Sequence, residues 1–304
     1  MLAIYISGND TPWGYGLVEL DADSNVVWKY LGAVHHDMDV THDGRIVTLT
    51  HQFTDAPLGG FFSFVPTPYL DDHLVTLSAD GKPQSSISIM QMLIHSPYGI
   101  SLRREEPWFA DFDPLHVNSV DWLSAADAKA LGIGKAGDVM IMLRQLNLVA
   151  VVDPDQQRII WASHGDWLDP HDPHVLPDGN ILMFDNMGRM FAHNRTRVIE
   201  FNPHNAGIVW RYEGSVEHPL DSAIRGMDER LANGNTLITE SDGGRLLEVT
   251  RSGDIVWEYF NPVRAGDNNR MIPVVSGAVR IDPTSLDADF KATLKPQPTA
   301  TQDN

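Results

Sequence analysis

The chain repeats two kinds of hairpin, and their alternation restricts its fold more than any other feature. The first kind places a Gly-containing turn between two apolar runs, as in VTHDGRIVTL (40–49), KAGDVMIML (135–143), VLPDGNILMF (175–184) and RLANGNTLIT (230–239). The second kind ends in an apolar–Trp–x strand, as in 18–30, 151–163, 199–212 and 247–259, with a weaker copy that lacks the Trp at 74–89. Asp, Asn and Gly between β-rich runs are typical of tight hairpins.

The spacing of the second hairpin gives the size of the repeating unit. Trp161, Trp210 and Trp257 lie 49 and 47 residues apart, close to the length of one four-stranded propeller blade. We therefore expect an all-β fold, a β-propeller of four-stranded blades. In each blade the first hairpin would join strands A and B, and the second would join C and D. A β-sandwich also spaces short strands with turns, but it does not explain the alternation.

Closure of the ring is less constrained by the spacing. Five hairpin sets are visible, and the apolar run 272–281 would supply a strand that closes the ring with the N-terminal strands. We expect six blades, although the spacing alone does not decide between five and six. Residues 1–286 would form the single propeller domain. The segment 122–137 would be a short helical insertion between strands A and B of one blade, and 287–304 a loose C-terminal tail.

Composition excludes several classes of function. The 41 acidic and 22 basic residues give a formal net charge of −19, which would repel nucleic-acid phosphates and anionic lipid. No stretch is long and apolar enough for membrane insertion, and the absence of cysteine excludes disulfides and a thiol nucleophile. The first residues do not form a recognisable signal peptide. As written, the chain would be cytoplasmic; a processed or incomplete N-terminus would make it periplasmic or secreted. The oligomeric state stays open.

Propeller geometry predicts where the polar residues meet. Strand A lines the central channel, so residues that enter A and residues that leave B lie at the same mouth, where such folds carry function. His36 and His171 each precede a hairpin glycine, Gly44 or Gly179, by eight residues. They therefore hold equivalent positions in two blades, although the adjacent His35 leaves open which of the pair faces the channel.

Other polar residues enter or leave neighbouring strands at this mouth. His116 enters a third A strand, and Arg144 leaves the B strand that follows it. The expected catalytic residues are His171, His36, His116 and Arg144. The expected substrate-binding residues are Asn118, Asn186, Arg225 and Glu240.

The same residues could be interpreted as a metal site, because three histidines can ligate zinc or copper. Arg144 argues against this, since a guanidinium repels a cation and suits an oxyanion. Calcium would need several carboxylates, and the nearest candidates are Asp113, Asp121, Asp185 and Glu240. We therefore expect neither a metal nor a cofactor at the mouth.

Five blocks in this order resemble a known family. They are HHDMDVTHDGRIV, LHVNSVDWL, GDVMIMLRQLNLVAVVD, HDPHVLPDGNILMFDN and RLANGNTLITESDGGRLLEVTRSGDIVWEY. The sequence is similar over about residues 15–262 to the PAPS-independent arylsulfotransferases, which are six-bladed propellers. The family's sulfated histidine lies five residues before the Leu-Pro of a Leu-Pro-x-Gly-Asn turn, which matches His171. Its His-x-Asn motif matches His116 and Asn118, its arginine matches Arg144, and a further histidine matches His36.

The resemblance implies an activity. The chain would transfer a sulfuryl group from an aryl sulfate to a phenol through a sulfohistidine, with ping-pong kinetics and without PAPS. Its partners would be small aryl sulfates and phenols. Pro170 stands where the family usually has glutamine, and Met187 interrupts the segment after strand B. Two other classes remain as alternatives: a calcium-dependent propeller hydrolase or lactonase, and a non-catalytic propeller that serves as a binding platform.

Overall fold

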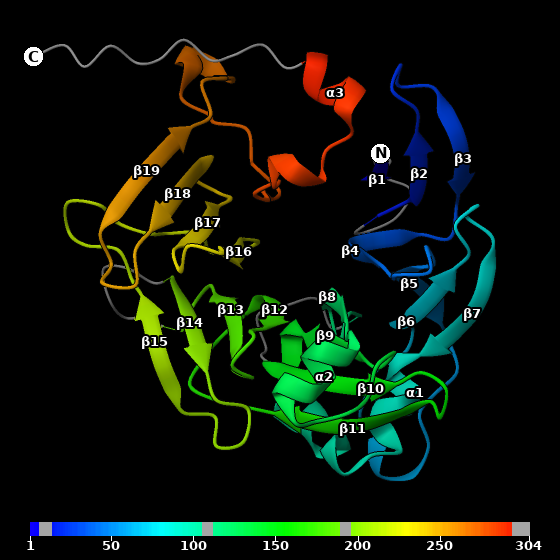
Figure 1. The fold of residues 1–304 in the computed structure, drawn as a ribbon. Coiled ribbons are helices and arrows are strands. Elements are labelled where there is room, and N and C mark those ends of the chain that lie inside the picture. The colour runs from blue at the N-terminus through cyan, green and yellow to red at the C-terminus, as the bar shows by residue number, and fades with distance from the viewer. Residues whose placement is uncertain (6–13, 105–111, 189–195, 294–304) are drawn as a thin grey trace, which may run out of the picture.

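Five antiparallel sheets surround a central channel in the computed structural model, which describes residues 1–5, 14–104, 112–188 and 196–293 (Figure 1). We number the sheets as blades 1 to 5 in chain order. Blade 1 contains β1 (Leu2–Tyr5), β2 (Gly16–Leu20) and β3 (Val26–Tyr30). Blade 2 contains β4 (Val34–Val40), β5 (Ile46–Thr54), β6 (Tyr69–Leu77) and β7 (Pro83–Ser88).

The other three blades repeat the same order. Blade 3 contains β8 (Val117–Trp122), β9 (Val139–Leu143), β10 (Leu148–Asp153) and β11 (Arg158–Ser163). Blade 4 contains β12 (His171–Val175), β13 (Ile181–Asp185), β14 (Arg197–Phe201) and β15 (Ile208–Tyr212). Blade 5 contains β16 (Met227–Arg230), β17 (Thr236–Glu240), β18 (Arg245–Val249) and β19 (Ile255–Phe260).

The predicted hairpins form as expected. In blades 2 to 5 each strand pairs with the next in chain order, and the innermost strands β4, β8, β12 and β16 face the centre of the ring (Figure 1). Apolar side chains fill the space between neighbouring blades, because a sheet must bury its apolar face against another layer. One buried cluster joins blades 2 and 3 with α1 (Ile89–Ile94), and another joins blades 3 and 4 with α2 (Ala125–Leu131).

Carboxylates link the inner strands of neighbouring blades. Asp37 Oδ2 on β4 accepts a hydrogen bond of 2.9 Å from Val120 N on β8. Asp172 Oδ2 on β12 accepts one of 2.9 Å from Asp228 N on β16. Asp37 and Asp172 directly follow His36 and His171, so the two His-Asp pairs serve equivalent places in the repeat. These bonds fix the position of each inner strand along the channel axis relative to the inner strand of the next blade.

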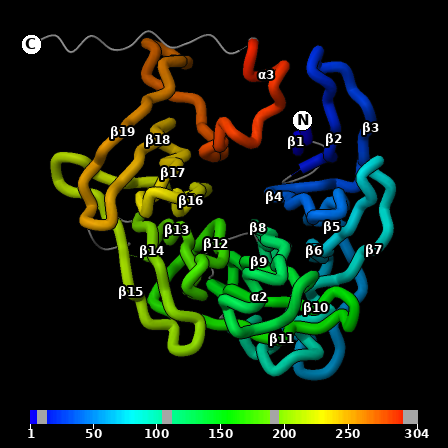
Figure 2. Tube along the Cα trace, in the orientation of Figure 1, coloured from blue at the N-terminus to red at the C-terminus, as the bar shows by residue number. Residues whose placement is uncertain are grey.

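The described residues contain five blades, not the six expected, and the predicted closing strand is wrong. Blade 1 has three strands, and 272–281 forms no strand. That segment runs along blade 5 instead, where Arg280 N donates to Glu229 Oε2 at 2.8 Å and Arg280 Nη2 to Glu248 Oε2 at 2.8 Å. Figure 2 shows the chain after β19 passing through the sector between blades 5 and 1. Hydrogen bonds to side chains of blade 5 therefore hold this segment. Its apolar run had instead indicated a strand paired with blade 1.

Two other segments bear on the predicted domain organisation. The insertion between β8 and β9 contains α2, which begins with a capping box of Ser124 and Asp127 and ends at the left-handed Gly132. Residues 287–293 include α3 (Ala288–Thr293), and the rest of the expected tail lies outside the described residues. Within the described part of the chain, no helix has the length and apolarity to cross a bilayer.

The tryptophans of the second hairpin rest on the next blade. Trp28 covers Gly81 of blade 2 so closely that a Cβ there would lie 2.3 Å from its ring. Trp210 Nε1 in blade 4 donates to Arg251 O of blade 5 at 2.8 Å. Trp257 of blade 5 has no sixth blade to cover in the described structure, lies beside 278–280 and keeps 43% of its surface exposed.

This difference predicts unequal losses of stability. Trp210→Ala should lower the free energy of unfolding by about 2 kcal/mol, because it removes packing and a hydrogen bond between two blades. Trp257→Ala should cost less than about 1 kcal/mol, since half-exposed side chains contribute less. Urea unfolding of both variants measures the two values. Equal losses would contradict the proposed difference in inter-blade packing.

Candidate functional site

The inner strands bend where they begin. The pairing register shifts between His35 and Met38 on β4, and between His171 and His174 on β12. His36 has φ 58°, and Asp172 has φ 56°, a left-handed conformation that is costly for residues other than glycine. Irregularities of this kind re-aim side chains beside functional sites. Blade 3 behaves likewise, with His116 at φ 47° just before β8.

His171 is held by Asn186, which follows β13. His171 Nδ1 lies 2.7 Å from Asn186 Oδ1. The amide nitrogen of Asn186 donates to Ser222 O at 2.7 Å and to Arg225 O, so its oxygen must face the imidazole. Nδ1 therefore carries the proton, and the lone pair resides on Nε2. Burial, followed by the nearby charge of Arg144, lowers the pKa of His171 to about 3, so the ring is neutral at pH 7.

Arg144 lies in the 3-10 turn after β9 and is 2% exposed. Its backbone N donates to His116 O at 3.3 Å, and its Nη2 lies 3.3 Å from Asp169 Oδ2. Asp169 O in turn lies 3.2 Å from His171 Nδ1. Arg144 and His171 therefore share one positioning residue. The carboxylate of Asp169 thus balances the positive charge of this guanidinium.

His116 and His36 approach the same space. Their ring centroids are 4.9 Å apart, and His116 Nδ1 lies 2.5 Å from Asp113 Oδ2. His36 is exposed to solvent. The pKa of His36 lies well below its usual value. Loss of hydration is the largest cause, followed by the nearby His35, His116, His171 and Arg144.

The structure answers which of the two adjacent histidines faces the channel. His35 is 1% exposed, and its ring lies 4.9 Å from that of His51. Its Nε2 is 3.4 Å from Asp72 Oδ1, and its Nδ1 is 2.7 Å from His36 Nδ1. His35 therefore supports His36 from behind.

The predicted substrate-binding residues are placed differently from one another. Asn118 Nδ2 donates to Pro170 O at 3.0 Å, which ties blade 3 to the residue before His171. Arg225 is exposed, and it is its backbone oxygen that contacts Asn186. Glu240 lies within blade 5, where Oε2 pairs with Arg245 Nη1 at 3.2 Å and Oε1 accepts from Asp221 N. The structure thus brings Asn118 and Asn186 to His171, whereas the described contacts of Glu240 lie elsewhere.

Sequence reasoning gave no role to Asp169 and considered Asp113 only as a calcium ligand. Each lies two or three residues before a site histidine, at the end of the loop that enters strand A. An acidic residue two or three positions before a site histidine is the sequence signal that could have identified them. At that distance a short loop can bring the carboxylate back to the imidazole, as Asp113 does, or to the adjacent Arg144, as Asp169 does.

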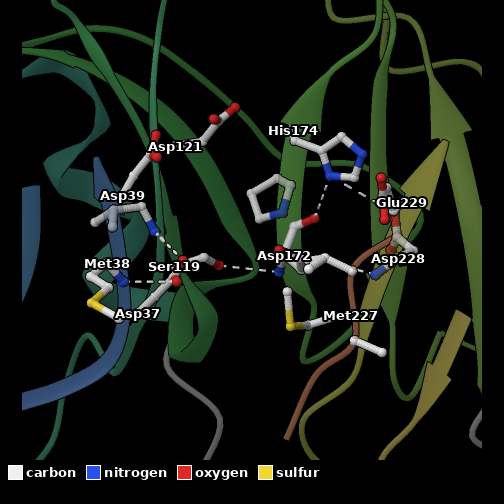
Figure 3. A pocket seen from close by; sticks show the side chains of 14 residues that line it. Asp37, Met38, Asp39, Ser119, Asp121, Asp172, His174, Met227, Asp228 and Glu229 are labelled. Atoms are coloured by element: carbon white, nitrogen blue, oxygen red, sulfur yellow. Dashed lines mark hydrogen bonds and ion pairs between the residues drawn. The ribbon is translucent and has the colours of Figure 1, made fainter. Parts of the chain in front are cut away.

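Carboxyl groups line the channel beyond the histidines. A cavity of about 240 Å³ opens there (Figure 3). Its lining does not include His36, His116 or His171, which we call the imidazole cluster. Burial, followed by the charge of Asp172, raises the pKa of Asp37 to about 7. Burial, followed by the charges of Asp39, Asp127 and Asp172, raises the pKa of Asp121 to about 8. The channel thus has an imidazole–guanidinium end and a carboxyl end.

These raised values predict that stability falls as the pH rises. A carboxyl group with a pKa near 4 when unfolded and about 8 when folded stabilises the fold fully below pH 4 and loses that contribution as the pH passes through 8. In a chelating buffer the free energy of unfolding should fall from pH 6.5 to pH 8; below pH 6.5 the lowered pKa values of His36 and His171 act in the opposite direction. Each group contributes at most about 1.4 kcal/mol per pH unit.

Asp121→Asn isolates one of these groups. The amide can still accept the backbone hydrogen bond of Val175, but it does not titrate, so the pH dependence of unfolding should become shallower. Asp23→Asn, at an exposed position, is the matched control and should leave the slope unchanged. A slope that Asp121→Asn does not alter would show that the carboxyl group titrates normally.

A family model described as arylsulfotransferase (ASST) matches residues 2–262, most of the chain. No curated protein matches the sequence.

Several solved structures match this chain at low sequence identity. Virginiamycin B lyase from Staphylococcus aureus is 14% identical, with a TM-score of 0.41 over 76% of this chain and 56% of that chain. A protein of unknown function from Bacteroides caccae is 12% identical, with a TM-score of 0.42 over 84% of this chain and 92% of that chain. The Dos1 propeller is 9% identical, with a TM-score of 0.45 over 83% and 55%. This chain spans little more than half of the lyase.

Proposed function

Because the chain belongs to the arylsulfotransferase family, we propose that it transfers a sulfuryl group from an aryl sulfate to a phenol through a covalent intermediate on His171. The observation that carries this proposal is the hydrogen bond from His171 Nδ1 to Asn186 Oδ1. It leaves the lone pair on Nε2 of a neutral ring, which is the form of imidazole that acts as a nucleophile.

The first displacement would form one bond and break one. His171 Nε2 attacks the sulfur, and the bond between sulfur and the aryl oxygen breaks, so that its electron pair leaves with the phenol oxygen. The product on the enzyme is an N-sulfohistidine whose Nδ1–H still donates to Asn186 Oδ1. In the second displacement an incoming phenol oxygen attacks the sulfur and restores neutral His171. Neither displacement needs a nucleotide donor.

Arg144 is the group we assign to the sulfuryl oxygens. A buried guanidinium offers several donors in a fixed plane, and such donors stabilise charge on tetrahedral anions. Its pairing with Asp169 fixes the direction of that plane before substrate arrives. Asn118 would act through Pro170 to position His171, with its second amide hydrogen available to substrate.

We assign proton transfer to His116 rather than to His36. The lowered pKa of His36 keeps that ring neutral at pH 7, and a neutral imidazole is a poor acid. His116 contacts the carboxylate of Asp113 at 2.5 Å, and a carboxylate in this place orients the imidazole and fixes which ring nitrogen faces the substrate. His116 would protonate the departing phenolate and accept the proton of the next phenol.

Removal of the nucleophile tests the activity. His171→Asn should abolish sulfuryl transfer from p-nitrophenyl sulfate while folding is retained, because no covalent intermediate can form. The wild-type chain mixed with donor alone should gain about 80 Da in an acid-labile form, and the variant should gain nothing. Retained transfer in the variant would overturn the mechanism. A wild-type chain that never becomes labelled would favour a binding platform, and a calcium requirement for ester hydrolysis would favour the hydrolase.

Asn186 offers a test of the tautomer. Asn186→Leu removes the closer acceptor for Nδ1–H and leaves Asp169 O at 3.2 Å. It should lower kcat by about 10-fold or more, because part of the enzyme then holds its proton on Nε2. Asn186→Asp keeps an acceptor and should restore part of kcat. Its added charge should raise the pKa of His171, so its rate should fall at acid pH where the wild type does not. Equal kcat in Asn186→Leu and the wild type would contradict the assigned role.

A further inference from the structure

A second polar group in the channel lies apart from the imidazole cluster. His174 and Asp172 project from β12, and Asp228 projects from β16 across the gap between blades 4 and 5 (Figure 3). One donor atom from each, an imidazole nitrogen or a carboxylate oxygen, lies within 4.8 Å of the other two. In the described residues no other group of three His, Asp or Glu side chains meets this spacing.

Asp228 is the residue that lacks compensation. Its side chain is fully buried, and neither carboxylate oxygen has a hydrogen-bond partner among the described residues. Arg230, two positions along β16, is engaged by Glu200 at 3.0 Å. The nearest candidate partner is His174 Nδ1, 4.0 Å from Oδ1. A buried carboxylate with no donor is unfavourable unless a positive charge compensates for it.

The surrounding contacts leave donor atoms for a ligand. Asp172 uses Oδ2 to accept from Asp228 N at 2.9 Å, so Oδ1 remains for another partner. His174 Nδ1 makes only a long contact of 3.4 Å with Asp172 O. The cavity of about 240 Å³ reaches all three side chains and Glu229, which gives space for water on an ion.

We infer that Asp172, His174 and Asp228 bind a divalent transition-metal ion, Zn²⁺ or Mn²⁺, that joins blade 4 to blade 5. Calcium and magnesium are held by oxygen ligands, whereas a set of two carboxylates and one imidazole suits zinc or manganese. Three protein ligands leave at least one coordination position for water. The ion would supply the positive charge that the buried carboxylate of Asp228 lacks. No step of the proposed sulfuryl transfer passes through it.

Calorimetric titration of the chelator-treated chain with Zn²⁺ and with Mn²⁺ tests the site. We expect saturable binding of one ion, and a thermal midpoint higher by about 5 °C at an ion concentration 100-fold above the dissociation constant. Calcium should bind at least 10-fold more weakly. The absence of saturable binding, or stronger binding of calcium, would overturn the inference.

Three variants locate the ion. Asp228→Asn should lose binding without loss of stability in the metal-free chain, because it removes an uncompensated buried charge. His174→Ala should weaken Zn²⁺ binding at least 10-fold. His36→Ala removes an imidazole from the other cluster and should bind Zn²⁺ as the wild type does. Loss of binding in His36→Ala with retention in Asp228→Asn would place the ion at the histidines and overturn the inference. These readouts involve no sulfuryl transfer, so failure here leaves the proposed activity standing.

Discussion

The site depends on the carboxylate–amide hydrogen bonds that join one inner strand to the next. Asp37 holds the N–H of Val120, Asp39 holds that of Trp122, and Asp172 holds that of Asp228. Strands of different blades share no backbone ladder, so these side chains set how far each inner strand reaches along the channel. A change of one residue in that register would move an imidazole by about 3.3 Å, farther than the span of a hydrogen bond.

The channel of this acidic protein relies on dehydration rather than on net positive charge. The one guanidinium of the cluster is paired with Asp169, and burial leaves His171 and His36 uncharged. Neutral rings keep lone pairs for bond formation, and a paired guanidinium keeps its orientation. An anionic substrate would therefore meet oriented donors, not a broad field of attraction.

The sequence predicted the parts of this arrangement that local chemistry determines. Turn residues specified the hairpins, the period of the tryptophans specified the blade, and the position of His171 before its hairpin placed it at the channel mouth. Long-range consequences were not accessible. Two residues of β4 between His35 and Met38 face no partner, whereas two residues of β12 face one, and spacing along the chain does not distinguish these bulges. The apolar run 272–281 has the pattern of a strand. The sequence does not reveal that Arg280 hydrogen-bonds to Glu229 and Glu248 of blade 5, which holds the segment there without strand pairing.

The five blades leave one seam, between β19 and blade 1, and its location has a mechanical consequence. His36, His116, Arg144 and His171 come from blades 2, 3 and 4, none of which borders the seam. If the ring opens at this seam, blades 1 and 5 would move outward, while blades 2, 3 and 4 would keep their positions relative to one another. The protein can thus combine a more weakly joined circumference with fixed distances between the side chains of the candidate site.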